Sequence, residues 1–553
     1  MFAEVALHRR IPSKFDVFTY SVPEGLALRV GQIIQVPFRK QTLPAIVRRL
    51  HRETPAYPTR PVEAALPTAL TDRQISLAFW MCEKYGVSFS KAIDFFVPEK
   101  IWNPARKITK NAAVETHESL IDEQTSFDFS PHPEYAAVKD FAKKLFSSTG
   151  KVLLIEKSRI PRAILFSCLA EMLPNGQQAL FLAPEIFATN QFAGCFSGSS
   201  AKFHSEMSET EKAQVWTSVK NGETNVIIGT RAALFLPFTN LGLIVLDSEN
   251  SESYSEKRQP NYHALDVAKQ LTELNKSKLI VVSSMPRAET WHAMESGEYE
   301  KIAWESDSAK SRVNIIDIKD ERRKGNFGIF AEKTIEKIAS TLTQNQQVLL
   351  FINRKGEAGA LMCTDCGHIL RCANCTSPMA LHTEGGLKCH KCNLAQEIPI
   401  ECSVCGNTRL RALGMGTERI EAEIKKTFKK ARILRLDRET IKGSSKISLE
   451  ELNKADVIVA TKIIDKPLNL PRLKLAVAVL PDSILHSHDF RTEERVFGLL
   501  THIKTLASGG DFIIQTFMPG HRVFRYLENG KIEEFYKEEL ATRKQLGLPP
   551  YNN

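Results

Sequence analysis

Short apolar runs separated by longer amphipathic stretches recur along most of the chain. From residue 138 onward, such runs lie at 152–155, 179–183, 226–228, 243–246 and 279–282. A second series begins near residue 312, with runs at 313–318, 347–352, 431–436, 456–460, 475–480 and 511–516. Apolar runs between helix-length segments are typical of parallel strands buried on both faces. The pattern therefore predicts an α/β protein with two consecutive lobes, at 133–310 and 311–553.

The N-terminal residues follow a different pattern. Short β-rich runs at 4–7, 30–37 and 45–47 precede a helical stretch at 71–97. Residues 1–102 are therefore expected to form a small β-rich domain. Residues 103–132 are polar, mixed in charge and poor in large aliphatic side chains, which predicts a linker.

Composition excludes some classes of protein without selecting one function. Hydrophobic residues make up 43% of the chain and charged residues 25%, as in ordinary globular proteins. No apolar run reaches the length of a membrane span, and the first residues lack the apolar core of a signal peptide. The net charge of +10 permits binding to phosphate groups but does not establish it.

Cysteine spacing indicates the most specific chemistry in the chain. Of 11 cysteines, eight form four Cys-x-x-Cys hooks: Cys363/Cys366, Cys372/Cys375, Cys389/Cys392 and Cys402/Cys405. Each hook can supply two thiolates from one tight turn, so four hooks suit two tetrahedral Zn(2+) ions per chain. Four thiolates leave no open position for a water, which predicts structural ions. A disulfide framework is the alternative, but reduced thiols and a cytoplasmic location are expected for a long chain without a secretory leader.

The pairing of the hooks is a question of loop length. The segment between Cys366 and Cys372 is short, whereas the one between Cys375 and Cys389 contains a Gly-Gly turn. We therefore expect a nested arrangement, and a cross-braced arrangement remains the alternative. The inner ion would be held by Cys372, Cys375, Cys389 and Cys392, and the outer ion by Cys363, Cys366, Cys402 and Cys405. His368, His382 and His390 are expected to contact solvent or nucleic acid.

Several long stretches resemble the PriA family of primosomal replication-restart proteins. The resemblance is carried by 362–406 with 414–418 after it, and by 204–247, 262–264 and 489–495. It implies a superfamily-2 helicase fold with two RecA-like lobes, a zinc-binding insertion at 361–412 in the second lobe, and an N-terminal domain for DNA 3′ ends. The linker stands where the family has a winged helix. The family continues with a domain beyond a Leu-Pro-Pro-aromatic stretch, which here ends the sequence, so that domain is expected to be absent or cut off.

The motor of that family is altered in the first lobe. Its phosphate loop holds a triphosphate through glycine N–H groups and a lysine. The corresponding residues 155–162 contain no glycine, and Pro161, which lacks an N–H group, replaces the lysine. The family's magnesium-binding Asp-Glu-Glu-His corresponds to 247–250. Asp247 and Glu249 could hold a cation there, but a solvated loop is the expectation.

The second lobe is altered at positions that also take part in ATP hydrolysis in that family. A family glycine and aspartate correspond to Pro467 and Asn469, while Leu506 and Gly509 stand where two arginines stabilise the transferring phosphate. Loss of one such arginine lowers the rate by a factor on the order of 10³–10⁵. We therefore expect no catalytic residue and no ATP-driven unwinding.

Some DNA-contacting positions of the family remain. Its pocket for a terminal 3′-OH corresponds to Phe15, Asp16 and Arg60, where the Asp16 carboxylate would accept a hydrogen bond from the hydroxyl. Core packing for Phe15 and a turn cap for Asp16 are the alternatives. Arg39 replaces a family glycine that lets the backbone approach the nucleotide.

Helicase positions near DNA are also matched. They are His204, 229–231 and Thr461. They could contact phosphate without ATP turnover. Turns that close an α/β sheet are an equally good interpretation.

These patterns favour a helicase-derived, zinc-bearing protein. It would bind branched or single-stranded DNA and nascent 3′ ends at stalled forks, and promote primosome assembly with other restart proteins, without helicase activity. One alternative is an ATP-dependent 3′-to-5′ DNA helicase with an atypical nucleotide site. Another is a zinc scaffold that binds only proteins.

Overall fold

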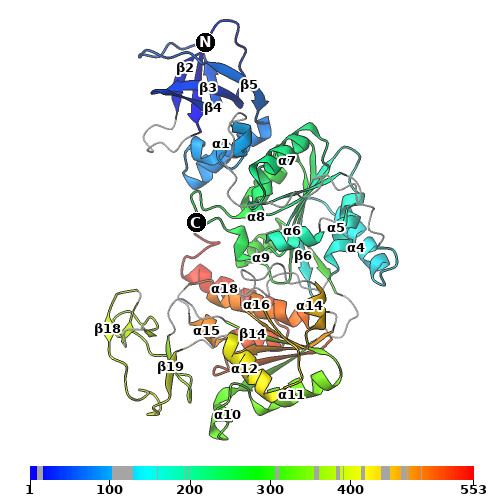
Figure 1. Cartoon of the computed structure of the whole chain (residues 1–553), viewed down its shortest axis with the longest axis vertical. Coiled ribbons are helices and arrows are strands. Elements are labelled where there is room, and N and C mark those ends of the chain that lie inside the picture. Colours follow the sequence, from blue (N-terminus) through cyan, green and yellow to red (C-terminus); the bar gives the residue numbers. More distant parts are fainter. Residues whose placement is uncertain are drawn as a thin grey trace. The chain divides into compact units, whose positions relative to one another are not determined.

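The structure is a computed structural model in which two compact units divide the chain. It describes residues 1–8, 17–102, 129–158, 160–192, 195–196, 199–305, 311–353, 360–381, 386–389, 391–412, 417–436, 449–461, 470, 472–486, 489–507 and 509–552. The first unit comprises 1–154, 160–283 and 297–302, and the second comprises 155–159, 284–296 and 303–553. Figure 1 traces both in chain order.

Five antiparallel strands form the N-terminal sheet of the first unit. They are β1 (Phe2–Leu7), β2 (Phe18–Ser21), β3 (Gln32–Phe38), β4 (Gln41–His51) and β5 (Ala64–Ala69), in the order β2-β1-β4-β3-β5. Alternate side chains such as Val5, Ile34 and Val47 are buried together on one face. The expected β-rich N-terminal domain is confirmed.

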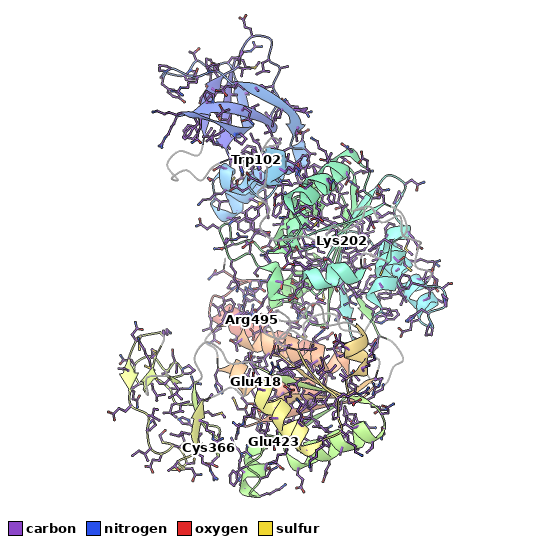
Figure 2. The ribbon with its side chains drawn as sticks, viewed as in Figure 1. Trp102, Lys202, Cys366, Glu418, Glu423 and Arg495 are labelled. Atoms are coloured by element: carbon purple, nitrogen blue, oxygen red, sulfur yellow. The ribbon has the colours of Figure 1, made fainter. Side chains whose placement is uncertain are left out.

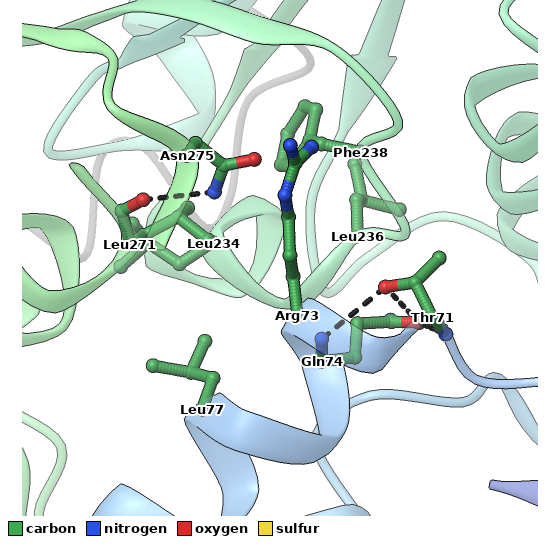
Figure 3. A pocket seen from close by; sticks show the side chains of 9 residues that line it. All are labelled: Thr71, Arg73, Gln74, Leu77, Leu234, Leu236, Phe238, Leu271 and Asn275. Carbon is green, nitrogen blue, oxygen red and sulfur yellow. Dashed lines mark hydrogen bonds between the residues drawn. The ribbon is translucent and has the colours of Figure 1, made fainter. Parts of the chain in front are cut away.

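Three helices follow this sheet and pack against the rest of the first unit. They are α1 (Asp72–Tyr85), α2 (Phe89–Ile93) and α3 (Glu99–Trp102). A capping box of Thr71 and Gln74 starts α1, and the Gln74 side chain also donates to the carbonyl of Phe235 at 2.8 Å. Trp216 Nε1 donates to the carbonyl of Phe96 at 2.8 Å. Figure 3 shows the pocket beside Gln74, whose 210 Å³ of empty space, open mouth included, is lined by nine residues, four of them leucines.

Seven strands make the α/β sheet of the first lobe, in the order β12-β6-β11-β10-β7-β9-β8. The strands are β6 (Lys151–Glu156), β7 (Gln178–Leu182), β8 (Ser200–Phe203), β9 (Val226–Gly229), β10 (Leu241–Leu246), β11 (Lys278–Ser283) and β12 (Glu300–Trp304). The accompanying helices are α4 (Tyr135–Ser147), α5 (Arg162–Glu171), α6 (Ile186–Phe192), α7 (Glu209–Asn221), α8 (Ala264–Asn275) and α9 (Ala288–Glu295). The strands β7, β8, β9, β10 and β11 run parallel, and β7 and β9 are buried throughout.

Six parallel strands make the sheet of the second lobe, in the order β13-β23-β22-β14-β21-β20. The strands are β13 (Arg312–Asp317), β14 (Gln347–Ile352), β20 (Ile433–Leu436), β21 (Val457–Ala460), β22 (Leu473–Val479) and β23 (Asp511–Thr516). The helices are α10 (Ile318–Arg323), α11 (Glu332–Thr343), α12 (Thr417–Thr427), α14 (Leu449–Lys454), α15 (Asp482–Leu485), α16 (Thr492–Leu506), α17 (Arg522–Glu528) and α18 (Ile532–Gln545). Ile338 of α11 and Ile424 of α12 join the strand core on one face. The expected α/β architecture with two lobes is confirmed.

A small β module is inserted after β14 of the second sheet. It has two pieces: β15 (Leu361–Cys363) pairs with β19 (Leu410–Ala412), and β16 (Ala380–Leu381), β17 (Leu387–Lys388) and β18 (Ala395–Gln396) form a second ladder. All eight cysteines of the four hooks lie in this module. We call 360–412 the cysteine module. The expected insertion in the second lobe is confirmed.

Most of the expected linker, 103–128, lies outside the described residues. Across the described ranges, no helix combines the length and the apolar character that crossing a bilayer would require.

Asp482, at the start of α15, is an acidic side chain in the core of the second unit. It is 2% exposed, and its Oδ1 accepts hydrogen bonds from Thr516 Oγ1 at 2.7 Å and from the Phe517 N–H at 2.9 Å. Burial raises the pKa of Asp482 to about 6, although these donors oppose the shift. The folded-state pKa therefore lies above the unfolded value near 4.

Stability should depend on pH through this carboxyl group. Because the folded state binds the proton of Asp482 more tightly than the unfolded state does, ionisation of this buried carboxyl group destabilises the fold. This destabilisation grows as the pH rises from about 4 to about 6 and is complete above that. Asp482→Asn should therefore stabilise the protein near pH 7.5 by about 2 kcal/mol, and this gain over wild type should shrink as the pH falls through 6. Thermal melting across that range checks it, with exposed Asp320→Asn as the control. A gain independent of pH would contradict a titration of Asp482.

Candidate metal centres and nucleotide edge

The cysteine module brings its eight thiols into two groups of four. One group is Cys363, Cys366, Cys402 and Cys405, and the other is Cys372, Cys375, Cys389 and Cys392; within each, all Sγ atoms lie within 4.8 Å of one another. This is the nested grouping. Within each group, the closest Sγ–Sγ distances between its two hooks are 3.3–3.7 Å, far longer than a disulfide bond and near the roughly 3.8 Å of a tetrahedral zinc–thiolate shell.

The four hooks fold into the same turn. In each hook, the backbone N–H of the residue four positions after the first cysteine donates to that cysteine's carbonyl; these donors are Gly367, Thr376, Asn393 and Gly406. The first cysteine's own N–H donates to the carbonyl of the residue five positions after it; these acceptors are His368, Ser377, Leu394 and Asn407. The residue four positions after the first cysteine has a positive φ in every hook: 77° at Gly367, 58° at Thr376, 60° at Asn393 and 70° at Gly406. This left-handed position suits glycine, which the outer group has, and asparagine; Thr376 is the exception. Each turn points two sulfurs to one side.

The surroundings of Cys375, in the inner group, favour its thiolate form, whereas the pKa of Cys392 in the same group is raised by its neighbouring thiols. Cys375 Sγ lies 3.3 Å from the Ser377 hydroxyl, which lowers the pKa of Cys375 to about 6 together with the Ser377 backbone N–H. A thiolate, not a thiol, is the metal ligand. The donor set and its geometry therefore fit a metal ion in each group, and four thiolates per ion suit zinc.

The module is packed firmly against the second sheet. Met362 and Ile369 share an apolar cluster with Phe517, which follows β23. A Cβ on Gly367 would lie 2.6 Å from the Phe517 side chain, so the turn of the first hook approaches that ring closely. Arg322 of α10 donates to the carbonyl of Thr364 at 3.1 Å. Cys366 is labelled within this part of the second unit in Figure 2.

At the edge of the first sheet, an ion pair joins the two altered motifs. The helix α5 begins at Arg162 after Pro161, which caps it without a side-chain hydrogen bond. Arg162 Nε donates to Asp247 Oδ1 at 2.7 Å, and the two side chains are 12% and 1% exposed. In the family that the sequence resembles, this carboxylate faces magnesium. Here the Arg162 guanidinium supplies the positive charge that faces the Asp247 carboxylate.

The loop after β10 is buried rather than solvated. Asp247 and Glu249 are both 0% exposed. The Tyr254 hydroxyl donates to the carbonyls of Leu182 at 3.0 Å and Asp247 at 2.6 Å. The expectation of a solvated loop at 247–250 is therefore wrong for Asp247 and Glu249, whose carboxylates are buried. The two hydrogen bonds of Tyr254 hold this loop next to the end of β7.

Positions of the family's DNA-end pocket are partly described. Phe15 and Asp16 lie outside the described residues. Arg60 is described: its Nη1 donates to the carbonyl of Arg39 at 3.2 Å. Arg39 has a φ of 56° in the β3–β4 turn, the left-handed conformation that favours the glycine of the family.

The remaining matched positions make contacts within the fold. Arg231 donates to the carbonyl of Ser253 at 2.7 Å and to Glu256 at 3.1 Å. Thr461 is 4% exposed at the end of β21. Leu506, at a position of a family arginine, is 8% exposed in α16, whereas Pro467 and Asn469 lie outside the described residues.

Comparison with known proteins places these features in one context. Residues 4–98 match the family model of the PriA 3′ DNA-binding domain. The chain is 33% identical over 439 residues to the replication restart protein PriA of Bacillus subtilis, a match that covers 75% of this chain and 54% of that protein. It is 29% identical over 562 residues to PriA of Rickettsia conorii, with 98% and 84% covered.

The extent of these matches differs between relatives. The chain spans about half the length of the Bacillus relative, 54%, and 58% of the length of PriA of Haemophilus influenzae, to which it is 32% identical. Among solved structures, it is similar to RecG bound to a three-way DNA junction, at 13% identity and a TM-score of 0.41, covering 75% of this chain and 47% of that one. That structural likeness is too weak to bear on function.

Proposed function

Because the chain belongs to the PriA family of replication restart proteins as a divergent member, we propose that it binds DNA at stalled replication forks without working as a helicase. The observation that carries the DNA-binding part is the match of residues 4–98 to a 3′ DNA-binding domain. The described part of that segment contains the sheet of β1 to β5, and Phe15 and Asp16 fall between β1 and β2 in the sequence.

The N-terminal domain would recognise the nascent 3′ end. A carboxylate at Asp16 would accept a hydrogen bond from a terminal 3′-OH and repel a terminal phosphate. Arg60, beside the β3–β4 turn, would add positive charge next to the nucleotide.

The two cysteine groups would hold one Zn(2+) ion each and keep the module in shape. Bound zinc would supply folding free energy rather than reactivity, because four thiolates close its coordination shell. The packing of Met362, Ile369 and Gly367 against Phe517 supports a fixed platform on the second sheet. Such a platform would suit DNA or the restart proteins that assemble a primosome in the cytoplasm.

The proposed loss of ATP turnover rests on the Arg162–Asp247 ion pair. A guanidinium 2.7 Å from the carboxylate leaves that oxygen engaged where a magnesium ligand would be needed. Pro161 removes an N–H donor from the start of α5, and Leu506 fills an arginine position with a buried apolar side chain.

A paired assay on zinc-loaded protein tests this function. We expect tight binding to a forked DNA with a nascent 3′-OH end, weaker binding when that end carries a 3′-phosphate, and no DNA-stimulated ATP hydrolysis. Asp16→Asn should reduce the preference for 3′-OH over 3′-phosphate. Turnover that rises with DNA would favour an atypical ATP-dependent 3′-to-5′ helicase, and absence of fork binding at physiological salt would favour a zinc scaffold for proteins.

A further inference from the structure

A row of two arginines and two histidines lies where the cysteine module meets the second sheet. Arg371, which directly precedes the second hook, places Nη2 3.4 Å from Nδ1 of His486, the residue that ends α15. Its Nη1 donates to the carbonyl of Thr376 at 3.0 Å. His521, the N-cap of α17, is near enough to act on the charge of His486, and Arg525 on the same helix acts on His521. The row draws on the module and on two helices of the lobe.

Nearby carboxylates do not neutralise this row. Within the described ranges, neither Arg371 nor Arg525 pairs with a carboxylate, and both residues are exposed. Glu493 lies 3.7 Å from Nε2 of His521, but it also pairs with Arg522. The positive charge at Arg371 and Arg525 is therefore available to an anion.

The tautomer of His486 follows from its neighbour. A guanidinium can only donate, so Nδ1 of His486 accepts from Arg371 and the ring carries its proton on Nε2. Burial, Arg371 and His521 together lower the pKa of His486 to about 4, so the ring is neutral at physiological pH. Nε2–H is thus a second donor beside the remaining N–H groups of Arg371.

We propose that Arg371 and His486 bind one backbone phosphodiester of DNA at this junction, with Arg525 adding to the attraction. The proposal rests on the DNA binding proposed above and locates a contact outside the N-terminal domain. A planar guanidinium matches two phosphate oxygens, and the ring N–H can donate to the same group. Because the Thr376 carbonyl fixes Arg371, little side-chain freedom is lost on binding.

The test is the salt dependence of binding to forked DNA by fluorescence anisotropy. Removing one phosphate contact should reduce the slope of log K against log[salt] by about 0.7–0.9. We expect this reduction and an affinity loss of about tenfold for Arg371→Ala, and a larger loss for Arg371→Glu. Arg371→Lys should keep most of the slope, because a lysine still offers one positive charge to phosphate.

A double-mutant cycle links the two residues to one phosphate. His486→Phe keeps a ring of similar size and removes both nitrogens. If both side chains hold the same group, the double variant Arg371→Ala/His486→Phe should lose less affinity than the product of the two single losses. Losses that simply multiply would overturn a shared site.

Controls separate a DNA contact from a structural defect. Arg432→Ala removes an exposed arginine already paired with Asp456 at 2.9 Å, so its slope should match wild type. The metal content of each Arg371 variant must stay at the wild-type value, because this residue precedes Cys372. If wild type binds forks and metal-loaded Arg371→Glu keeps the full slope, only this inference fails. If wild type does not bind forks, the proposed function fails and this inference falls with it.

Discussion

Replacing Cys372 and Cys392 together should leave one zinc ion per chain, whereas replacing Cys366 and Cys392 together should leave none. The first pair belongs to one group of four cysteines, and the second pair takes one ligand from each group. A site reduced from four thiolates to three loses its closed shell and most of its affinity. Metal content of purified serine variants, measured by mass spectrometry, checks the nested grouping directly.

The loss of metal should also unfold the module. The buried cluster inside it is small and includes two of the ligands, Cys372 and Cys389, beside Leu361, Met379 and Leu387. Structural zinc sites contribute about 10–16 kcal/mol of apparent binding free energy in small peptides, more than such a core can replace. Chelation should therefore expose the module to proteolysis while the two α/β sheets stay folded.

The control is a cysteine outside both groups. Cys82 lies in α1, so Cys82→Ser should retain two ions. If Cys372→Ser/Cys392→Ser loses both ions and Cys366→Ser/Cys392→Ser keeps one, the hooks pair differently from the structure. A variant set that never carries metal, wild type included, would contradict zinc at either group.

The sequence predicted the fold well because its strands are apolar throughout. The run at 347–352 appears as β14, buried along its whole length, and the run at 179–183 overlaps all but the first residue of β7. A strand inside a doubly covered sheet leaves that signal without any knowledge of its neighbours. The order of strands in each sheet depends on long-range pairing, which no local pattern contains.

The candidate sites were predictable only where spacing is local. Each hook uses a turn of six residues, so the cysteine spacing contains nearly all of its geometry. The pair of Arg162 and Asp247 joins residues 85 positions apart, and nothing beside either residue indicates the other. The burial of Glu249 was missed for the same reason, since a polar stretch looks solvated until the chain folds over it. Arg371 and His486, 115 positions apart, were also missed.

Arg162→Met should destabilise the first unit by about 3–5 kcal/mol, because it leaves a buried carboxylate without its cation. Asp247 is 0% exposed, and Arg162 Nε is the charged donor 2.7 Å from its Oδ1. Replacing both partners with apolar side chains removes the unpaired charge. The double variant Arg162→Met/Asp247→Leu should therefore recover much of the loss, as buried ion pairs replaced by apolar groups commonly do. Urea unfolding followed by limited proteolysis of the first unit measures the stability of the single and the double variant.

The same variants distinguish an ion pair that takes the place of a nucleotide's cation from a site that can still bind a nucleotide. If the Arg162 guanidinium replaces the cation of a nucleotide complex, ATP with Mg²⁺ should not raise the melting temperature of wild type. A binding site would raise it, by about 2.7 kcal/mol of stability at a hundredfold excess over Kd. Arg162→Met should not gain this response, since Pro161 still lacks its N–H donor. Surface Arg323→Met, which loses only an exposed pair with Asp320, should change stability by less than about 1 kcal/mol. An equally small effect at Arg162, or stabilisation of wild type by ATP, would contradict the proposal that this ion pair prevents ATP turnover.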